Sequence, residues 1–259
     1  MSELLGEFFG TMVMVALGVG TGAAVNLKKS YAKNANWFYI IFAWGLAVTF
    51  GVYVAANFGS KAHLNPAVTL GMAVGGYFPW DKVFTYIVAQ FIGAFFGGLI
   101  PYIHYYAHFK ETKNEAEGNH VGIFATGPAT NSPIFNFIDE TIDTFIFVFV
   151  LIHLGNFGEG LKPFIAGFLV IVIGLALGPT TGLAMNPARD WSPRLVYTIF
   201  PVPYKSTANW SYAWVPMCGP LLGGVLAALL NYSLQNYICL LYTSPSPRDL
   251  STSRMPSSA

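Results

Sequence analysis

The chain has 259 residues, of which 54% are hydrophobic and only 10% are charged, and its mean hydropathy is +0.52. These values exclude an ordinary soluble domain. The formal net charge of +1 argues against binding of nucleic acid or another polyanion. Only two cysteines occur, Cys218 and Cys239, both in or beside the last apolar stretch, so we expect neither a disulfide nor a metal site.

Several apolar stretches have the length of about 20 residues that a helix needs to cross about 30 Å of hydrocarbon. In chain order we expect six transmembrane helices, near residues 3–25, 37–58, 83–108, 134–156, 161–179 and 211–237. The N-terminus has no basic region, and the first stretch is too long for a cleavable signal peptide. The predicted fold class is therefore an all-α membrane protein.

Two short runs repeat the tripeptide Asn-Pro-Ala about half a chain apart, as Asn65-Pro66-Ala67 and Asn186-Pro187-Ala188. Proline in the first turn of a helix gives up no hydrogen bond, and an asparagine before it can cap the helix. The segments around the two runs are too short and too polar to cross a bilayer. We expect two re-entrant half-helices buried in protein, near 66–76 and 187–198.

The two halves of the chain resemble each other in register. Glu7-x-x-x-Thr11 opens the first span, and Glu140-x-x-x-Thr144 opens the fourth. Each half has three spans, with an Asn-Pro-Ala run between its second and third span. Because three is odd, the second half enters from the opposite side, which makes an inverted repeat. The predicted division is a first half-repeat at 1–108, a linker loop at 109–133 and a second half-repeat at 134–238.

Residues 241–259 differ from the rest, since they are polar and interrupted by prolines. We expect either a disordered tail or a foreign extension of the chain, and we favour the extension. The N-terminus is expected on the cytoplasmic side. This orientation leaves more lysines outside than inside, against the positive-inside tendency.

With these motifs the chain resembles the aquaporin superfamily, and within it the glycerol-facilitator (aquaglyceroporin) branch, over about residues 3–237. Two Asn-Pro-Ala runs in an inverted six-span repeat, with Arg189 directly after the second, carry the family resemblance. Asp190, Arg194 and the pair Pro216-Met217 carry the resemblance to the branch, although leucine or isoleucine is more usual than methionine there. The resemblance implies a homotetramer in the plasma membrane with one pore per subunit, no cofactor and no enzymatic activity.

The resemblance also implies roles for individual residues. Asn65 and Asn186 would offer side-chain N–H groups to a solute hydroxyl at the middle of the membrane. The selectivity filter would consist of Trp44, Gly174, Leu183 and Arg189, with the arginine binding solute oxygens and repelling cations. Backbone carbonyls of the loops that enter the half-helices would form a ladder of acceptors, at Lys61, Ala62, His63, Thr181, Gly182 and Leu183. Glu7 and Glu140 would hold these loops by hydrogen bonds.

The implied function is a passive channel for glycerol and other small uncharged solutes, with some water, that excludes ions and protons. Glycerol facilitators usually have an aromatic residue where Leu183 stands, so we expect a wider solute range that includes dihydroxyacetone, urea and protonated lactic acid. One alternative is a channel that conducts mainly water, against which Asp190, Arg194 and Pro216 argue. An alternative of another class is a proton-coupled transporter that uses Glu7 and Glu140. Asp143 has no expected role.

Overall fold

The computed structural model describes residues 1–114, 118–155 and 160–243, with side chains up to residue 237. Within these residues every regular element is a helix, so the predicted all-α class is confirmed. In chain order the elements are α1 (Ser2–Asn26), α2 (Trp37–Asn57), α3 (Pro66–Val74), α4 (Trp80–His104), α5 (Tyr106–Glu111), α6 (His120–Phe124), α7 (Pro133–His153), α8 (Leu161–Ala176), the 3-10 turn η1 (Gly178–Thr180), α9 (Pro187–Ile199) and α10 (Trp214–Thr243).

Four predicted spans begin or end three or more residues away from the helix ends in the structure. α7 ends at His153 and not at residue 156. α4 begins directly after Pro79 and ends at His104, so the third span lies closer to the N-terminus than 83–108. α8 ends at Ala176 and gives way to η1, which makes the fifth helix shorter than 161–179. α10 continues to Thr243, so the first residues of the expected tail are helical, and the tail from residue 244 on lies outside the described residues.

The linker predicted at 109–133 contains regular structure. It holds the last residues of α5 and all of α6, whose N-cap Asn119 accepts a hydrogen bond from Gly122 N at 2.8 Å. Phe109 and Phe124 are fully buried in the same apolar cluster as residues of α1. Burial of these aromatic rings explains why the linker folds back onto the bundle.

The helices cross at very short backbone distances where glycines replace larger residues. A Cβ atom on Gly93 of α4 would lie 2.2 Å from Phe8 O of α1, and a Cβ atom on Gly223 of α10 would lie 2.3 Å from Thr141 O of α7. Such contacts between small residues are typical of packed membrane helices. They bring α1 against α4 and α7 against α10, in equivalent places of the two halves.

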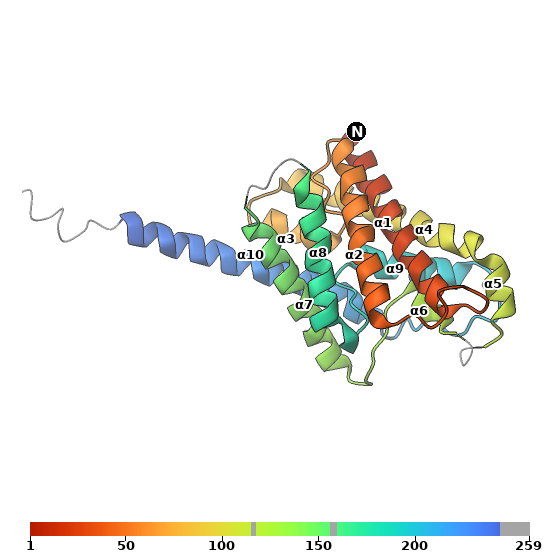
Figure 1. The fold of residues 1–259 in the computed structure, drawn as a ribbon. Helices are drawn as coiled ribbons and strands as arrows, with labels where there is room; N and C mark the ends of the chain where they lie inside the picture. Colours follow the sequence, from red (N-terminus) through yellow and green to blue (C-terminus); the bar gives the residue numbers. More distant parts are fainter. Residues whose placement is uncertain (115–117, 156–159, 244–259) are drawn as a thin grey trace, which may run out of the picture.

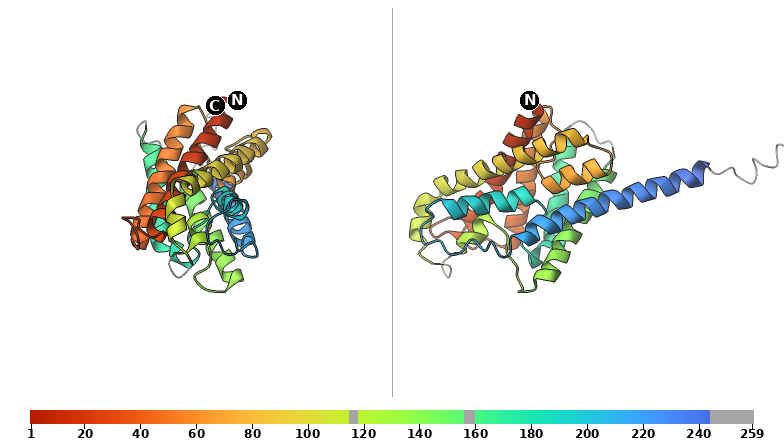
Figure 2. Two further views of the ribbon diagram at one scale, coloured as in Figure 1. Left: turned by 90° about the vertical axis from the view of Figure 1, so that its right-hand side faces the viewer. Right: turned by 180° about the vertical axis from the view of Figure 1, so that it is seen from behind.

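Both half-helices are enclosed by the long helices. Gly71 of α3 faces Gly224 of α10, and Pro193 of α9 faces Gly98 of α4, at separations that admit no side chain on these glycines. Figures 1 and 2 show the same arrangement from opposite sides, with α2 and α8 together on one side of the bundle and α4, α9 and α10 on the other. The end of α10 extends beyond the rest of the bundle in both figures.

Four of the described helices are long and apolar enough to cross a membrane: α1, α2, α4 and Trp214–Tyr237 of α10. α8 is apolar but has only 16 residues, and α7 carries carboxyl groups, of which Glu140 and Asp143 are buried inside the protein. Large apolar side chains cover the outside of these helices, among them Phe42, Phe50, Phe84, Phe96, Phe164 and Phe168. This surface fits hydrocarbon, and the protein is a membrane protein.

Candidate functional site

The two half-helices begin alike, because each Asn-Pro-Ala run caps its own helix. Asn65 Oδ1 accepts from Ala67 N at 2.8 Å, and Asn186 Oδ1 accepts from Ala188 N at 3.0 Å and Arg189 N at 3.3 Å. Proline stands at the first helical position in both cases. The local sequence therefore determines where α3 and α9 start.

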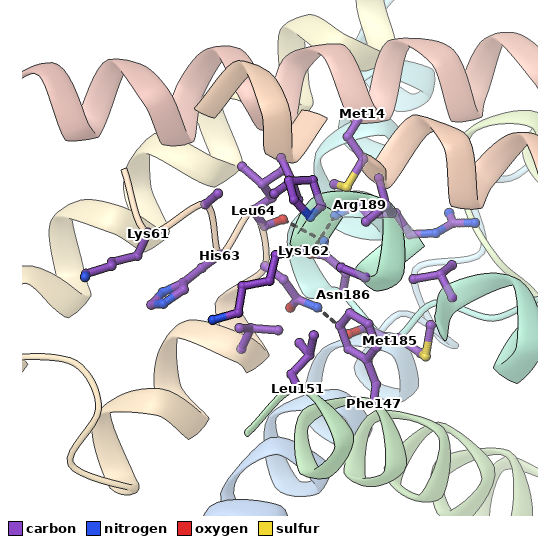
Figure 3. A pocket seen from close by; sticks show the side chains of 18 of the residues that line it. Met14, Lys61, His63, Leu64, Phe147, Leu151, Lys162, Met185, Asn186 and Arg189 are labelled. Carbon is purple, nitrogen blue, oxygen red and sulfur yellow. Dashed lines mark hydrogen bonds between the residues drawn. The ribbon is translucent and has the colours of Figure 1, made fainter. Parts of the chain in front are cut away.

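Hydrogen bonds between the two runs join the half-helices to each other. Asn65 Nδ2 donates to Met185 O at 2.8 Å, and Asn186 Nδ2 donates to Leu64 O, also at 2.8 Å. Figure 3 shows the Asn186 amide beside Leu64. Each amide thus uses one of its two hydrogens for the other loop, and its second hydrogen has no protein acceptor among the described residues.

Glu7 of α1 holds the first loop. Its carboxyl group has no exposed surface and accepts from His63 N at 3.0 Å, from Leu64 N at 2.8 Å and from the Ser60 hydroxyl. Gln90 of α4 also donates to this carboxyl group, at 2.8 Å. The roles of Gln90 and Ser60 in holding this loop were not predicted from the sequence.

Glu140 of α7 holds the second loop in the same way. It is fully buried and accepts from Thr181 Oγ1 at 2.6 Å and from Ala184 N and Met185 N at 2.8 Å. Three donors on one carboxyl group leave it little freedom to move. The hydrogen bonds that the sequence analysis expected from Glu7 and Glu140 are therefore present.

The backbone of both loops alternates between left-handed and other conformations. Ala62 and Leu64 have φ of 55° and 52°, and Leu183 and Met185 have φ of 58° and 46°, while His63 and Ala184 between them are not left-handed. Non-glycine residues adopt this conformation only where the surrounding structure enforces it. The hydrogen bonds to Glu7 and Glu140 on one side of each loop supply that enforcement.

A cavity of about 480 Å³ runs along the first loop and between the half-helices. Its polar wall includes Asn65, Asn186 and the loop residues Lys61, Ala62 and His63. Its apolar wall includes Met14, Val48, Val68, Met72, Phe147 and Val170. Polar groups on one side and hydrocarbon on the other suit a small molecule that has hydroxyl groups along one edge.

A second cavity, of about 180 Å³, is lined by residues of α1, α2, α6 and the segment before the second half-helix. The two cavities share three lining residues, Trp44, Leu183 and Arg189. Arg189 Cζ lies 4.2 Å from the centre of the Trp44 ring, a distance typical of a cation–π contact. Three of the four residues expected in the filter therefore meet where the cavities meet.

The fourth expected filter residue, Gly174, lines neither cavity. A Cβ atom there would lie 2.8 Å from Leu183 Cδ2 and 2.7 Å from Ile41 Cγ2, and its carbonyl accepts from Trp37 Nε1 at 2.8 Å. Gly174 thus makes room for the Leu183 side chain instead of facing the passage. Thr181 of the expected carbonyl ladder also lines neither cavity, because its side chain faces Glu140.

Arg189 makes no ion pair with its neighbour Asp190. Asp190 pairs with Arg194 at 2.8 Å, both side chains are fully buried, and Asp190 also accepts from Thr126 N and Oγ1 at 2.7 Å. Arg194 Nη1 donates to Ala208 O at 2.7 Å. This pair connects α9 to the segments before α7 and α10. Because Asp190 is occupied by Arg194, the Arg189 guanidinium is free of Asp190 and lines both cavities.

The remaining residues singled out in the sequence lie outside the passage. Pro216 is buried and Met217 half-buried in the first turn of α10. Cys218 is a free, exposed cysteine, and the side chain of Cys239 lies outside the described residues. Asp143 is 2% exposed and its Oδ2 has no hydrogen-bond partner in the described part of the chain; nothing in the structure explains an aspartate at this position.

Comparisons with known proteins agree with this geometry. The family model described as "Major intrinsic protein" matches residues 1–231. The chain is 63% identical over 231 residues to glycerol uptake facilitator protein 2 of Lactiplantibacillus plantarum (89% of this chain, 98% of that one), and 46% identical over 226 residues to the glycerol uptake facilitator protein of Bacillus subtilis (86% and 81%). The structure of the aquaglyceroporin from Plasmodium falciparum superimposes with a TM-score of 0.80 at 30% identity, over 93% of this chain and 97% of that one.

Proposed function

The chain belongs to the major intrinsic protein family, and on that premise we propose that it is a passive channel for glycerol and other small uncharged solutes. The observation that carries the proposal is the meeting of two cavities at Trp44, Leu183 and Arg189. The protein is a channel and not an enzyme. Solutes move through it in both directions, down their own gradients.

The residues of the passage act on the two sides of the solute. Asn65 and Asn186 donate their remaining amide hydrogens, and the loop carbonyls accept solute hydroxyl hydrogens. Trp44 and the apolar wall contact the carbon side. Arg189 donates to solute oxygens at the constriction, where its planar group offers several donors at once.

Cations are excluded by three positive groups that face the passage. Each half-helix presents an N-terminus of about +0.5 elementary charge to the passage. At about 4 Å and an effective dielectric constant of about 20, each end opposes a monovalent cation by about 2 kcal/mol, so the two together oppose it by about 4 kcal/mol. Arg189 and the desolvation of the ion add to this barrier, which a neutral solute does not meet.

Leu183 widens the solute range. Its flexible side chain stands where an aromatic ring would give a smaller and stiffer opening, and Gly174 leaves space behind it. Dihydroxyacetone, urea and protonated lactic acid are therefore substrates beside glycerol, with some water.

The wider organisation is part of the same proposal. Two half-repeats, 1–108 and 134–238, form the inverted pair, and four copies assemble in the plasma membrane with the N-terminus in the cytoplasm. Equivalent contacts of Glu7 and Glu140 with the two loops support the assignment of the two half-repeats as an inverted pair.

An osmotic-shock assay tests the function. Proteoliposomes are exposed in turn to gradients of glycerol, urea, a five-carbon polyol and an impermeant solute, and light scattering reports shrinkage and reswelling. A glycerol channel gives fast reswelling in glycerol, whereas a channel for water alone gives fast shrinkage without reswelling. Accumulation of solute against its gradient, driven by a pH gradient, would identify the proton-coupled transporter instead.

A further inference from the structure

The larger cavity reaches solvent between the loop that follows α2 and the first turn of α8. We call this end the lysine mouth; it is lined by Tyr53, Ser60, Lys61, Gly160, Lys162 and Pro163. Both lysines are exposed. In Figure 3 the side chains of Lys61, His63 and Lys162 lie on the same side of the cavity, away from Met185 and Arg189.

A hydrogen bond fixes the two sides of the lysine mouth relative to each other. The Tyr53 hydroxyl of α2 donates to Gly160 O, the residue before the first turn of α8. Lys162 is in that turn, and Lys61 is four residues past the end of α2. The two ammonium groups are therefore carried by elements that are tied together at the opening.

The described residues around this opening bring positive charge to it and no carboxylate. Among the described residues that line the cavity there is no aspartate or glutamate. Glu7 of α1, whose carboxyl group contacts this loop, is fully buried and is turned to the backbone of His63 and Leu64. Neither Lys61 nor Lys162 makes an ion pair with a described residue, and the positive end of α8 adds to the same field.

We propose that the lysine mouth binds a small, soluble phosphate monoester, and that the bound anion blocks the entry of neutral solutes. Two ammonium groups at one opening match a doubly charged group with several terminal oxygens, whereas a monocarboxylate offers a single charge. The anion stops at the mouth, because the apolar wall beyond it offers no donors to replace the water that a doubly charged phosphate would lose. The inference rests on the proposed function, since the block is read as a loss of glycerol flux.

The test uses the full chain in phosphatidylcholine vesicles, so that the lipid supplies no anionic headgroup. Glycerol reswelling is measured with glycerol 3-phosphate on both sides of the membrane, and sodium chloride of equal ionic strength serves as the reference. Variants are Lys61→Gln/Lys162→Gln and, as a matched control, Lys110→Gln, which removes an exposed lysine of α5 that lines neither cavity. Each flux is expressed relative to the same variant without phosphate ester.

We expect glycerol 3-phosphate to inhibit the wild-type chain and Lys110→Gln equally, and the double variant to need about tenfold more ester for the same inhibition. Inhibition that is equal in all three proteins, or absent from the wild type while glycerol still passes, overturns the inference. If no protein passes glycerol, the proposed function fails instead. Equilibrium dialysis of radiolabelled glycerol 3-phosphate against the detergent-solubilised proteins then still decides whether the two lysines bind it.

Discussion

Glu140→Ala tests whether the second pore loop depends on one carboxyl group. Glu140 is fully buried and accepts three hydrogen bonds, from Thr181 Oγ1, Ala184 N and Met185 N. Alanine leaves these donors without an acceptor, at a cost of about 1–3 kcal/mol each. The sum of about 3–9 kcal/mol is a large part of the 5–15 kcal/mol that typically separates folded from unfolded chains. We expect the apparent Tm in detergent to fall by about 10 °C or more and glycerol flux to be lost.

The control is Asp139→Asn, one residue away in α7. Asp139 takes part in no hydrogen bond between described residues, so its amide variant should keep the Tm of the wild type within a few degrees. Glu140→Gln should fall between the two, because its amide retains one carbonyl acceptor but turns an NH2 group toward the remaining donors. Wild-type Tm and wild-type glycerol flux in Glu140→Ala would refute the reasoning.

Three further substitutions test the constriction and the support behind it. Leu183→Phe should narrow the opening, keep glycerol flux and slow a five-carbon polyol by roughly tenfold in reswelling assays; unchanged selectivity would contradict the role of Leu183. Arg194→Met leaves Asp190 buried without its cation and should cost about 3–5 kcal/mol, read as a lower Tm, which a normal Tm would disprove. Arg189→Leu should raise the cation leak, measured with a potential-sensitive dye. The leak should stay far below the glycerol flux, because the two helix ends still contribute about 4 kcal/mol to the barrier. An unaltered leak would show that Arg189 does not contribute to the barrier against cations.

The start of each half-helix could be predicted to the residue. Asparagine followed by proline is a local signal, and α3 and α9 begin at Pro66 and Pro187 as expected. The hydrogen-bond partners of the asparagine amides could not be predicted in this way. Their acceptors, Met185 O and Leu64 O, are 120 and 122 residues away in the chain, and nothing in the local sequence refers to them.

The lysine mouth and the linker also depend on contacts between residues that are distant in the chain, which the local sequence does not predict. Lys61 was expected in the first pore loop, but Lys162 has the sequence context of an ordinary surface lysine, and only the folded chain brings the two to one opening. The short helix α6 could not be predicted from the sequence, since it is too short to show a helical pattern of apolar residues. It is stabilised by the burial of Phe124 against α1 and α9. Positions that depend on long-range packing therefore had to come from the structure.

The crossed hydrogen bonds between the two loops also bear on biosynthesis. Leu64 leaves the ribosome well before Asn186, its donor 122 residues later. At about 5–20 residues per second, translation needs roughly 6–24 s to supply that donor. During this interval Glu7 can already bind the backbone N–H groups of the first loop, but the Leu64 carbonyl has no donor from the second half. Water or the insertion machinery must therefore hydrogen-bond to this carbonyl until Asn186 has been synthesised.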